Sequence, residues 1–75
     1  MPMIDVTAAA GTFADKHALA QDLAKTLMRW EKVPEIPFFT DNTAAFIHDL
    51  EPAAISTAAG ASNHVRVQVI SGKRA

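Results

Sequence analysis

The sequence predicts a small α+β protein in which a strand, a helix and a second strand follow one another and a third strand comes last. Residues 2–8 and 64–70 alternate apolar and polar side chains, as half-buried strands do. The stretch from Leu19 to Trp30 repeats apolar residues at helical spacing. A strand–helix–strand order within about fifty residues is typical of a parallel pair joined by a crossover helix, so we expect a βαβ unit with an additional strand.

The first strand and the helix have recognisable limits. The strand carries Ile4 and Val6 on one face, and Gly11 ends it. Thr12, followed three residues later by Asp15, resembles a capping box, which predicts that both side chains bind free backbone NH groups where the helix begins. The apolar stripe of the helix is predicted to pack into the core and consists of Leu19, Ala20, Leu23, Ala24, Leu27 and Trp30.

The second half of the chain is predicted to be extended and rich in turns. Pro34 and Pro37 should end the helix and keep the following connection extended, because each fixes its own φ and discourages helix in the residue before it. Residues 43–50 form the second predicted strand, and residues 56–63 form a loop of small residues that we interpret as a connection. Residues 64–70 form the third strand, with its valines facing inward.

The composition indicates one small domain, residues 1–75, whose own core is marginal. A chain of 75 residues buries a modest share of its surface, and this one has no cysteine for a disulfide and no zinc spacing among its three histidines. We therefore expect self-association, in which the sheet packs against a copy of itself. The net charge of −1 favours neither nucleic acid nor a membrane surface as a partner. The lack of a membrane span and of a signal peptide predicts a cytoplasmic protein.

Pro2 is the residue with the greatest chemical potential. Methionine is usually removed ahead of a small residue, and removal of Met1 would expose the secondary amine of Pro2. An α-amino group has a pKa of about 8 in water, and burial in an apolar pocket lowers that pKa. A base works best when its pKa lies near the working pH, so Pro2 is the candidate catalytic residue, provided that Met1 is removed.

An amino-terminal proline on a first strand, then a helix and a second strand, resembles the tautomerase superfamily, which includes 4-oxalocrotonate tautomerase. Residues 2–12, 16–27 and 42–70 are most similar to the first half of longer members such as cis-3-chloroacrylic acid dehalogenase. The resemblance implies a tautomerase without a cofactor, in which Pro2 moves a proton between the keto and enol forms of a small 2-oxo or 2-hydroxydienoate acid. It also implies trimers or hexamers, built from copies of this chain or with a homologous subunit. Whether the chain is a short subunit or one half of a longer one stays open.

The resemblance further implies basic residues that bind the substrate carboxylate. Long members place arginines just after the third predicted strand, where this chain has Lys73 and Arg74. Arg66 is another candidate, because a cation on the polar face of an interior strand is costly unless it meets an anion. The arginines of short members are absent, since residues 11–12 are Gly-Thr and residues 42–43 are Asn-Thr.

Five other side chains are candidates for shaping the site. His17 and His48 could tune it, although we interpret each as a surface or packing residue. Phe38, Phe39 and Phe46 could wall an apolar pocket that lowers the pKa of the proline, although core packing is the default interpretation for aromatic residues. These residues take second place to Pro2 and the basic residues.

Two alternative functions stay open. The chain could be a non-catalytic protein that keeps the fold and oligomerises, which the missing arginines favour. It could also be a decarboxylase or dehalogenase of the same superfamily, in which a cationic proline activates an unsaturated acid for water addition. The helix position at which the dehalogenase carries a functional histidine is Leu27 here, which is evidence against that chemistry.

Overall fold

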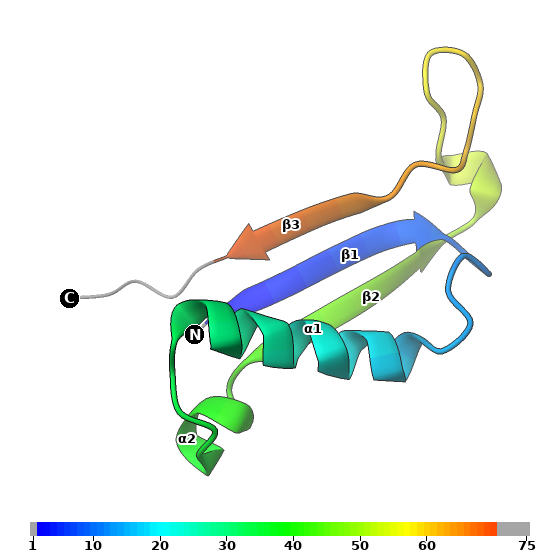
Figure 1. Cartoon of the computed structure of the whole chain (residues 1–75). Helices are drawn as coiled ribbons and strands as arrows, with labels where there is room; N and C mark the ends of the chain where they lie inside the picture. The colour runs from blue at the N-terminus through cyan, green and yellow to red at the C-terminus, as the bar shows by residue number, and fades with distance from the viewer. Residues whose placement is uncertain (1, 71–75) are drawn as a thin grey trace.

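A computed structural model describes residues 2–70, which form a three-stranded sheet with one long helix on one face (Figure 1). The sheet has the order β2–β1–β3, with β1 parallel to β2 and antiparallel to β3. The predicted α+β class, with a βαβ unit and a third strand, is therefore confirmed. In chain order the elements are β1 (Met3–Ala9), α1 (Lys16–Glu31), α2 (Pro37–Thr40), β2 (Ala44–Leu50), the 3-10 helix η1 (Pro52–Ala54) and β3 (Arg66–Ile70).

The start of α1 corrects the predicted capping box. Asp15 caps the helix, because its carboxylate accepts a hydrogen bond from the backbone NH of Ala18 at 3.0 Å. The hydroxyl of Thr12 instead donates to the carbonyl of Ala9 at 2.6 Å. Thr12 therefore belongs to the turn that follows β1, and the prediction that it caps the helix was wrong.

Asp15→Ala is expected to lower the free energy of unfolding by about 1 kcal/mol, because the NH of Ala18 loses its acceptor. Thr12→Ala is the matched control, and we expect a smaller loss because its exposed hydroxyl bonds only within the preceding turn. Urea unfolding followed by circular dichroism measures both variants. A larger loss for Thr12→Ala than for Asp15→Ala would show that Thr12 supports the helix after all.

The connection after α1 contains a short helix where the sequence predicted an extended segment. α1 ends because Lys32 takes the left-handed conformation, with φ 58°, and the NH of Val33 donates to the carbonyl of Met28. Pro34 lies beyond this end, as predicted. Pro37 begins α2, because the fixed φ and missing NH of proline suit the first position of a helix.

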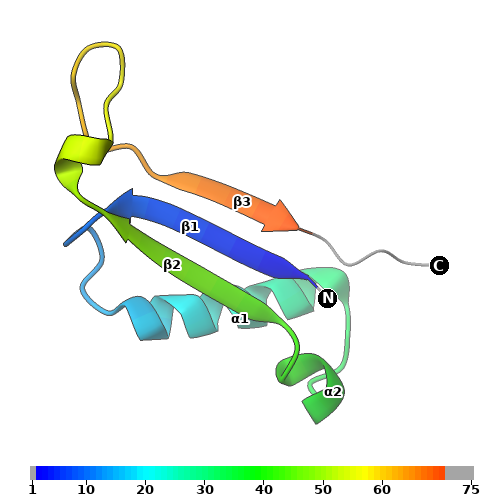
Figure 2. The same cartoon turned by 180° about the vertical axis from the view of Figure 1, so that it is seen from behind.

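The core is small and lies between α1 and the strands β1 and β2 (Figures 1 and 2). Its buried apolar side chains among the described residues are Val6, Ala8, Leu27 and Met28. Trp30, which the sequence placed in the same stripe, is 82 % exposed. Leu27 and Met28 both face the sheet. An α-helix has 3.6 residues per turn, so Trp30 points about 110° around the helix axis from the direction midway between Leu27 and Met28.

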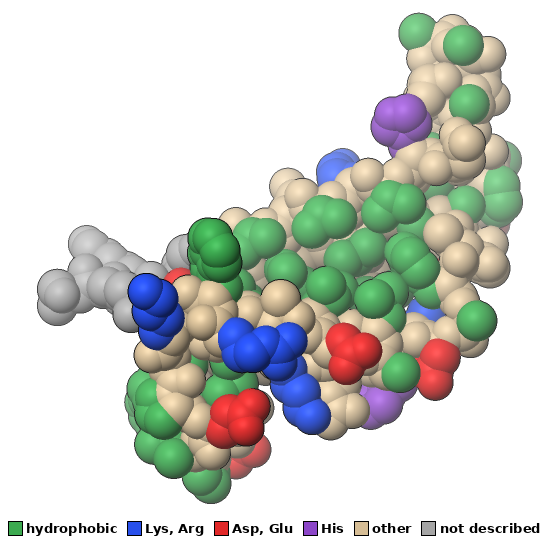
Figure 3. Space-filling model, in the orientation of Figure 1, with side chains coloured by type: hydrophobic (Ala, Val, Ile, Leu, Met, Phe, Trp, Pro, Cys, Tyr) green, Lys and Arg blue, Asp and Glu red, His purple; other side chains and the backbone are tan. Residues whose placement is uncertain are grey.

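The helix-side face of β3 is not covered within the described chain. The register pairs Val67 with Val6 and Val69 with Ile4, so these valines continue the face that α1 covers on β1. However, Val65, Val67 and Val69 are 45 %, 55 % and 52 % exposed, and we call these three residues the valine face. Figure 3 shows hydrophobic side chains gathered over the sheet beside α1. The alternation was predicted correctly, but the valines do not face a core, because α1 lies over β1 and β2.

The opposite side of the sheet, which we call the open face, has no helix of residues 2–70 packed along its strands (Figure 2). Asp5 and Thr7 of β1 lie on this face, with Phe46 and His48 of β2 on one side and Arg66 of β3 on the other. The open face therefore combines a polar strip with an exposed aromatic ring.

None of the helices within residues 2–70 is long and apolar enough to cross a membrane.

Candidate functional site

Pro2 lies buried at the end of the sheet where the parallel strands β1 and β2 begin. Met3 pairs with Ala44, so Pro2 and Thr43 are the residues that precede this pair on the two strands. Thr43 is 7 % exposed, and its Oγ1 atom has no hydrogen-bond partner within residues 2–70. Pro2 therefore lies at a buried end of the sheet, where the neighbouring strand is preceded by an unpaired hydroxyl.

β3 finishes at this same end of the sheet. Ile70 pairs with Met3 and is the last described residue. Lys73 and Arg74, the predicted carboxylate-binding residues, lie outside the described residues, three and four positions after Ile70.

Arg66 lies towards the other end of β1. It pairs with Thr7, five residues along the strand from Pro2, and a strand rises about 3.3 Å per residue, so about 16 Å separates Pro2 from the Thr7–Arg66 pair. Arg66 forms no ion pair with any residue from 2 to 70. The structure does not bring Arg66 and Pro2 together within one chain, and a small carboxylate could contact both only if Arg66 came from a neighbouring chain.

His48 is held on the open face by a carboxylate. Its Nε2 atom lies 2.8 Å from Oδ1 of Asp5, and its ring stacks near that of Phe46, with centroids 6.4 Å apart. The side chain of His48 is 51 % exposed. These contacts agree with the interpretation of His48 as a surface residue.

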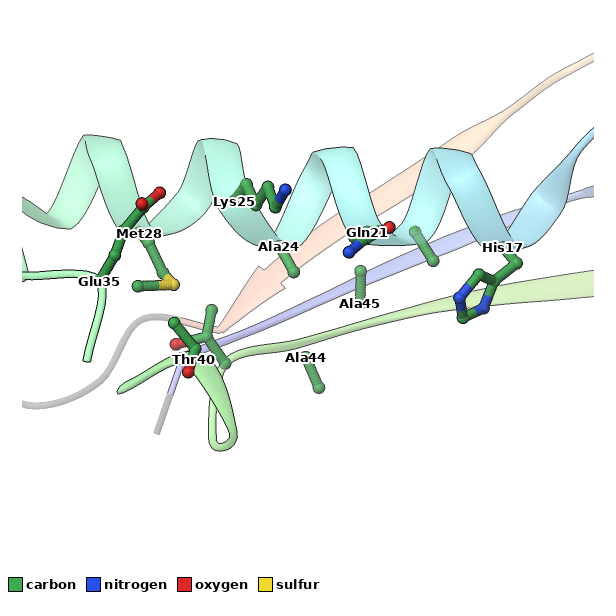
Figure 4. A pocket seen from close by; sticks show the side chains of 11 residues that line it. His17, Gln21, Ala24, Lys25, Met28, Glu35, Thr40, Ala44 and Ala45 are labelled. Carbon is green, nitrogen blue, oxygen red and sulfur yellow. The ribbon is translucent and has the colours of Figure 1, made fainter. Parts of the chain in front are cut away.

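A cavity of about 520 Å³ lies between α1 and the beginning of β2 (Figure 4), and we call it the helix–strand cavity. Figure 4 shows Ala24 and Met28 pointing from α1 towards the strand, with Ala45 opposite them. Small side chains on both elements leave this space. The polar residues that line it are His17, Gln21, Lys25, Glu35, Thr40 and Thr43. Thr43 also belongs to the sheet end that contains Pro2, so the cavity reaches this end of the sheet, although Pro2 itself does not line it.

The helix–strand cavity was not predicted from the sequence, and the aromatic residues predicted as pocket walls lie elsewhere. Phe38 and Phe39 contact each other edge to face in α2, with ring centroids 5.1 Å apart. Neither of them, nor Phe46, lines the helix–strand cavity. The sequence does contain alanines in the helix and in the second strand. They indicate a cavity only when it is known that these two elements face each other.

The described residues offer acid–base and binding groups at this end of the sheet. Within residues 2–70, no cluster of three or more His, Cys, Asp or Glu side chains is arranged to hold a metal ion. The buried Pro2 position, the unpaired Thr43 hydroxyl and the adjoining cavity form the candidate site.

No protein-family model, curated protein or solved structure matches this chain.

Proposed function

We propose that the protein is a tautomerase without a cofactor, in which the amine of Pro2 is the general base after Met1 is removed. The observation that carries the proposal is the buried position of Pro2 at the start of the central strand of a βαβ unit. Burial disfavours the cationic form of an amine and moves its pKa from about 8 towards neutral pH. A base whose pKa lies near the working pH is the most effective catalyst.

The proposed reaction moves one proton from oxygen to carbon. The neutral Pro2 amine accepts the hydroxyl proton of an enol or 2-hydroxydienoate acid and becomes cationic. The electrons of the O–H bond form the carbonyl group, while the electrons of the carbon–carbon double bond take a proton from the Pro2 ammonium. The products are the 2-oxo acid and the neutral amine, so the base is regenerated in each turnover.

Lys73 and Arg74 are the proposed partners of the substrate carboxylate. They follow Ile70, which pairs with Met3 next to Pro2. A guanidinium group can bind a carboxylate through two parallel hydrogen bonds, which orients the substrate as well as holding it. Arg66 takes this role only towards the Pro2 of a neighbouring chain, because about 16 Å of strand separates the two within one chain.

We also propose that the chain associates with a second copy of itself. The radius of gyration is 14.4 Å, whereas a compact chain of this length has about 11 Å. The accessible surface is 5493 Å², which is about 1,000 Å² more than a compact monomer of the same mass exposes. The uncovered valine face is the apolar surface that a second copy would bury.

Val67→Lys is expected to shift the wild-type assembly to a monomer, because a buried and unpaired ammonium on the valine face opposes association. Gln68→Lys is the matched control, since it adds the same charge to the opposite face of the same strand. Size-exclusion chromatography with light scattering measures both variants. If the wild type itself is a stable monomer, the proposed self-association is wrong. If only Gln68→Lys dissociates the assembly, the copies meet through the open face.

The test of the catalytic proposal is the ketonisation of phenylenolpyruvate. Protein whose mass shows that Met1 is absent should accelerate it. A chain with one serine inserted before Pro2 should lose the acceleration, because the Pro2 nitrogen becomes an amide without basicity. Equal acceleration by both proteins would show that the Pro2 amine is not the base.

A non-catalytic oligomerising protein is the second candidate, and the exposed apolar surface favours it. Besides the valine face, Trp30 and Phe38 are 82 % and 60 % exposed. This candidate predicts assembly without ketonisation in the same two measurements. Dehalogenase chemistry receives less support, because Leu27, at the position of the functional histidine, is buried in the core and bears no ionisable group.

A further inference from the structure

A second cavity lies at the far end of the sheet from Pro2, and we call it the distal cavity. It has a volume of about 590 Å³, within the usual range for small-molecule sites. It is open to solvent and lies where the segment after η1 returns to the start of β3. The lining residues that matter for binding are Thr7, Leu50, Ile55, Ser56, His64 and Arg66.

The lining of the distal cavity carries basic side chains, and the carboxylate of Asp5, on the same open face, is paired with His48. Arg66 and His64 are the ionisable side chains among the described residues that line it, and no described aspartate or glutamate does so. Neither forms an ion pair with residues 2–70. A guanidinium group carries five NH donors, so Arg66 offers an unoccupied anion site at the edge of the cavity.

The other lining residues suit an organic anion better than an inorganic one. Leu50 and Ile55 provide apolar surface, and Thr7 adds a hydroxyl group. The hydroxyl of Ser56 donates to the carbonyl of Thr57. Thr7 is paired with Arg66 in the sheet, so a hydroxyl oxygen accompanies the guanidinium across the strands. A ligand with a charged head and a short apolar body matches both parts of this lining.

The segment beside the distal cavity is held by its own hydrogen bonds. The NH of Thr57 donates to the carbonyl of Ala61 at 2.8 Å, and the NH of Ala61 donates to the hydroxyl of Thr57 at 3.1 Å. Gly60 occupies the turn with φ 92°, a conformation that favours glycine. Ser56 and His64, on either side of this turn, both line the cavity.

We propose that the distal cavity binds a small organic monoanion, a carboxylate with a short aliphatic body, through the guanidinium group of Arg66. The apolar body lies against Leu50 and Ile55. Within one chain the site is separate from the proposed catalytic site, because about 16 Å of β1 lies between Pro2 and the Thr7–Arg66 pair. Binding there does not depend on the Pro2 amine, so this inference stands or falls independently of the tautomerase proposal.

The experiment is a titration of the full isotope-labelled chain with sodium butyrate, followed by amide chemical shifts at constant pH and ionic strength. Saturating shifts are expected at Thr7, Ser56 and Arg66. Butyramide, which has the same shape without the charge, should bind at least about tenfold more weakly, because hydrogen bonds to a charged group are the stronger ones. Saturating shifts confined to Met3 and Ile70 would place binding at the Pro2 end instead and overturn the proposal.

Two substitutions of Arg66 and one control complete the test. Arg66→Gln should weaken butyrate binding about tenfold or more, and Arg66→Lys should weaken it less, because it keeps the charge but loses the paired donors. Arg29→Gln removes an exposed cation of α1 that lines neither cavity and should leave binding unchanged. The proposal is overturned if butyramide binds as tightly as butyrate, if the shifts do not saturate, or if folded Arg66 variants bind as the wild type does.

Discussion

Pro2→Ala is expected to lower kcat for phenylenolpyruvate ketonisation by about 10² to 10⁴-fold, the usual contribution of a positioned general base. Alanine is small enough to allow removal of Met1, so both proteins have a free amine. The variant loses the ring that fixes the direction of the nitrogen at the buried start of β1. Steady-state kinetics should be measured on proteins of confirmed mass, with matching circular dichroism spectra and oligomeric states. Retention of the wild-type rate would exclude Pro2 as the base for this substrate.

The pH dependence of ketonisation by the wild-type protein should show whether the neutral or the cationic form of the Pro2 amine is active. A general base acts in its neutral form, so kcat/KM should rise as the pH rises through the pKa of the amine and then level off. Burial of Pro2 predicts a midpoint below the ordinary value of about 8. A rate that instead falls as the pH rises through this range would indicate a cationic proline, and would favour the hydration chemistry of the dehalogenases and decarboxylases.

Leu27→Ala should produce the largest loss of stability, about 2 to 5 kcal/mol in the free energy of unfolding. Leu27 is 5 % exposed and is one of the few buried apolar side chains between α1 and the sheet. The loss has two parts: the hydrophobic free energy of the buried methyl groups that are removed, and the cost of the cavity that they leave, which a core of this size cannot close. Because small domains are stable by only about 5 to 15 kcal/mol, the variant should unfold at a much lower urea concentration.

Trp30→Ala is the matched control on the same helix. Trp30 is larger than Leu27 but 82 % exposed, so we expect its removal to change the free energy of unfolding by less than about 0.5 kcal/mol. Urea unfolding at several protein concentrations separates folding from assembly. A loss as large as that of Leu27→Ala would show that another chain covers Trp30.

The strands and the helix were predictable because their signals are local. Alternation placed the strands at residues 2–8, 43–50 and 64–70, and the structure has them at Met3–Ala9, Ala44–Leu50 and Arg66–Ile70. The errors lie where two local signals compete. Thr12 and Asp15 can each cap a helix, and the turn after β1 takes the hydroxyl of Thr12 and leaves Asp15 to begin α1.

The candidate site was predictable only in part. The sequence identified Pro2 as the chemically unusual residue and placed it at the start of a strand. Arg66, Lys73 and Arg74 were predicted together as carboxylate-binding residues, because no feature of the neighbouring sequence separates Arg66 from the other two. The antiparallel register of β3 against β1 separates Arg66 from Pro2 within the chain, whereas it brings Ile70 to Met3.

By itself, the sequence determined the order and approximate limits of the main elements, the parallel βαβ connection and the position of Pro2 at a strand start. These follow from alternation, helical spacing and chain length, which act over a few residues at a time. Only the tertiary structure decided that Pro2 is buried beside Thr43, that Arg66 belongs to a distal cavity, and that the valine face is uncovered. Each of these depends on strand register and on the reach of α1 across the sheet, which are set by contacts between residues far apart in the chain.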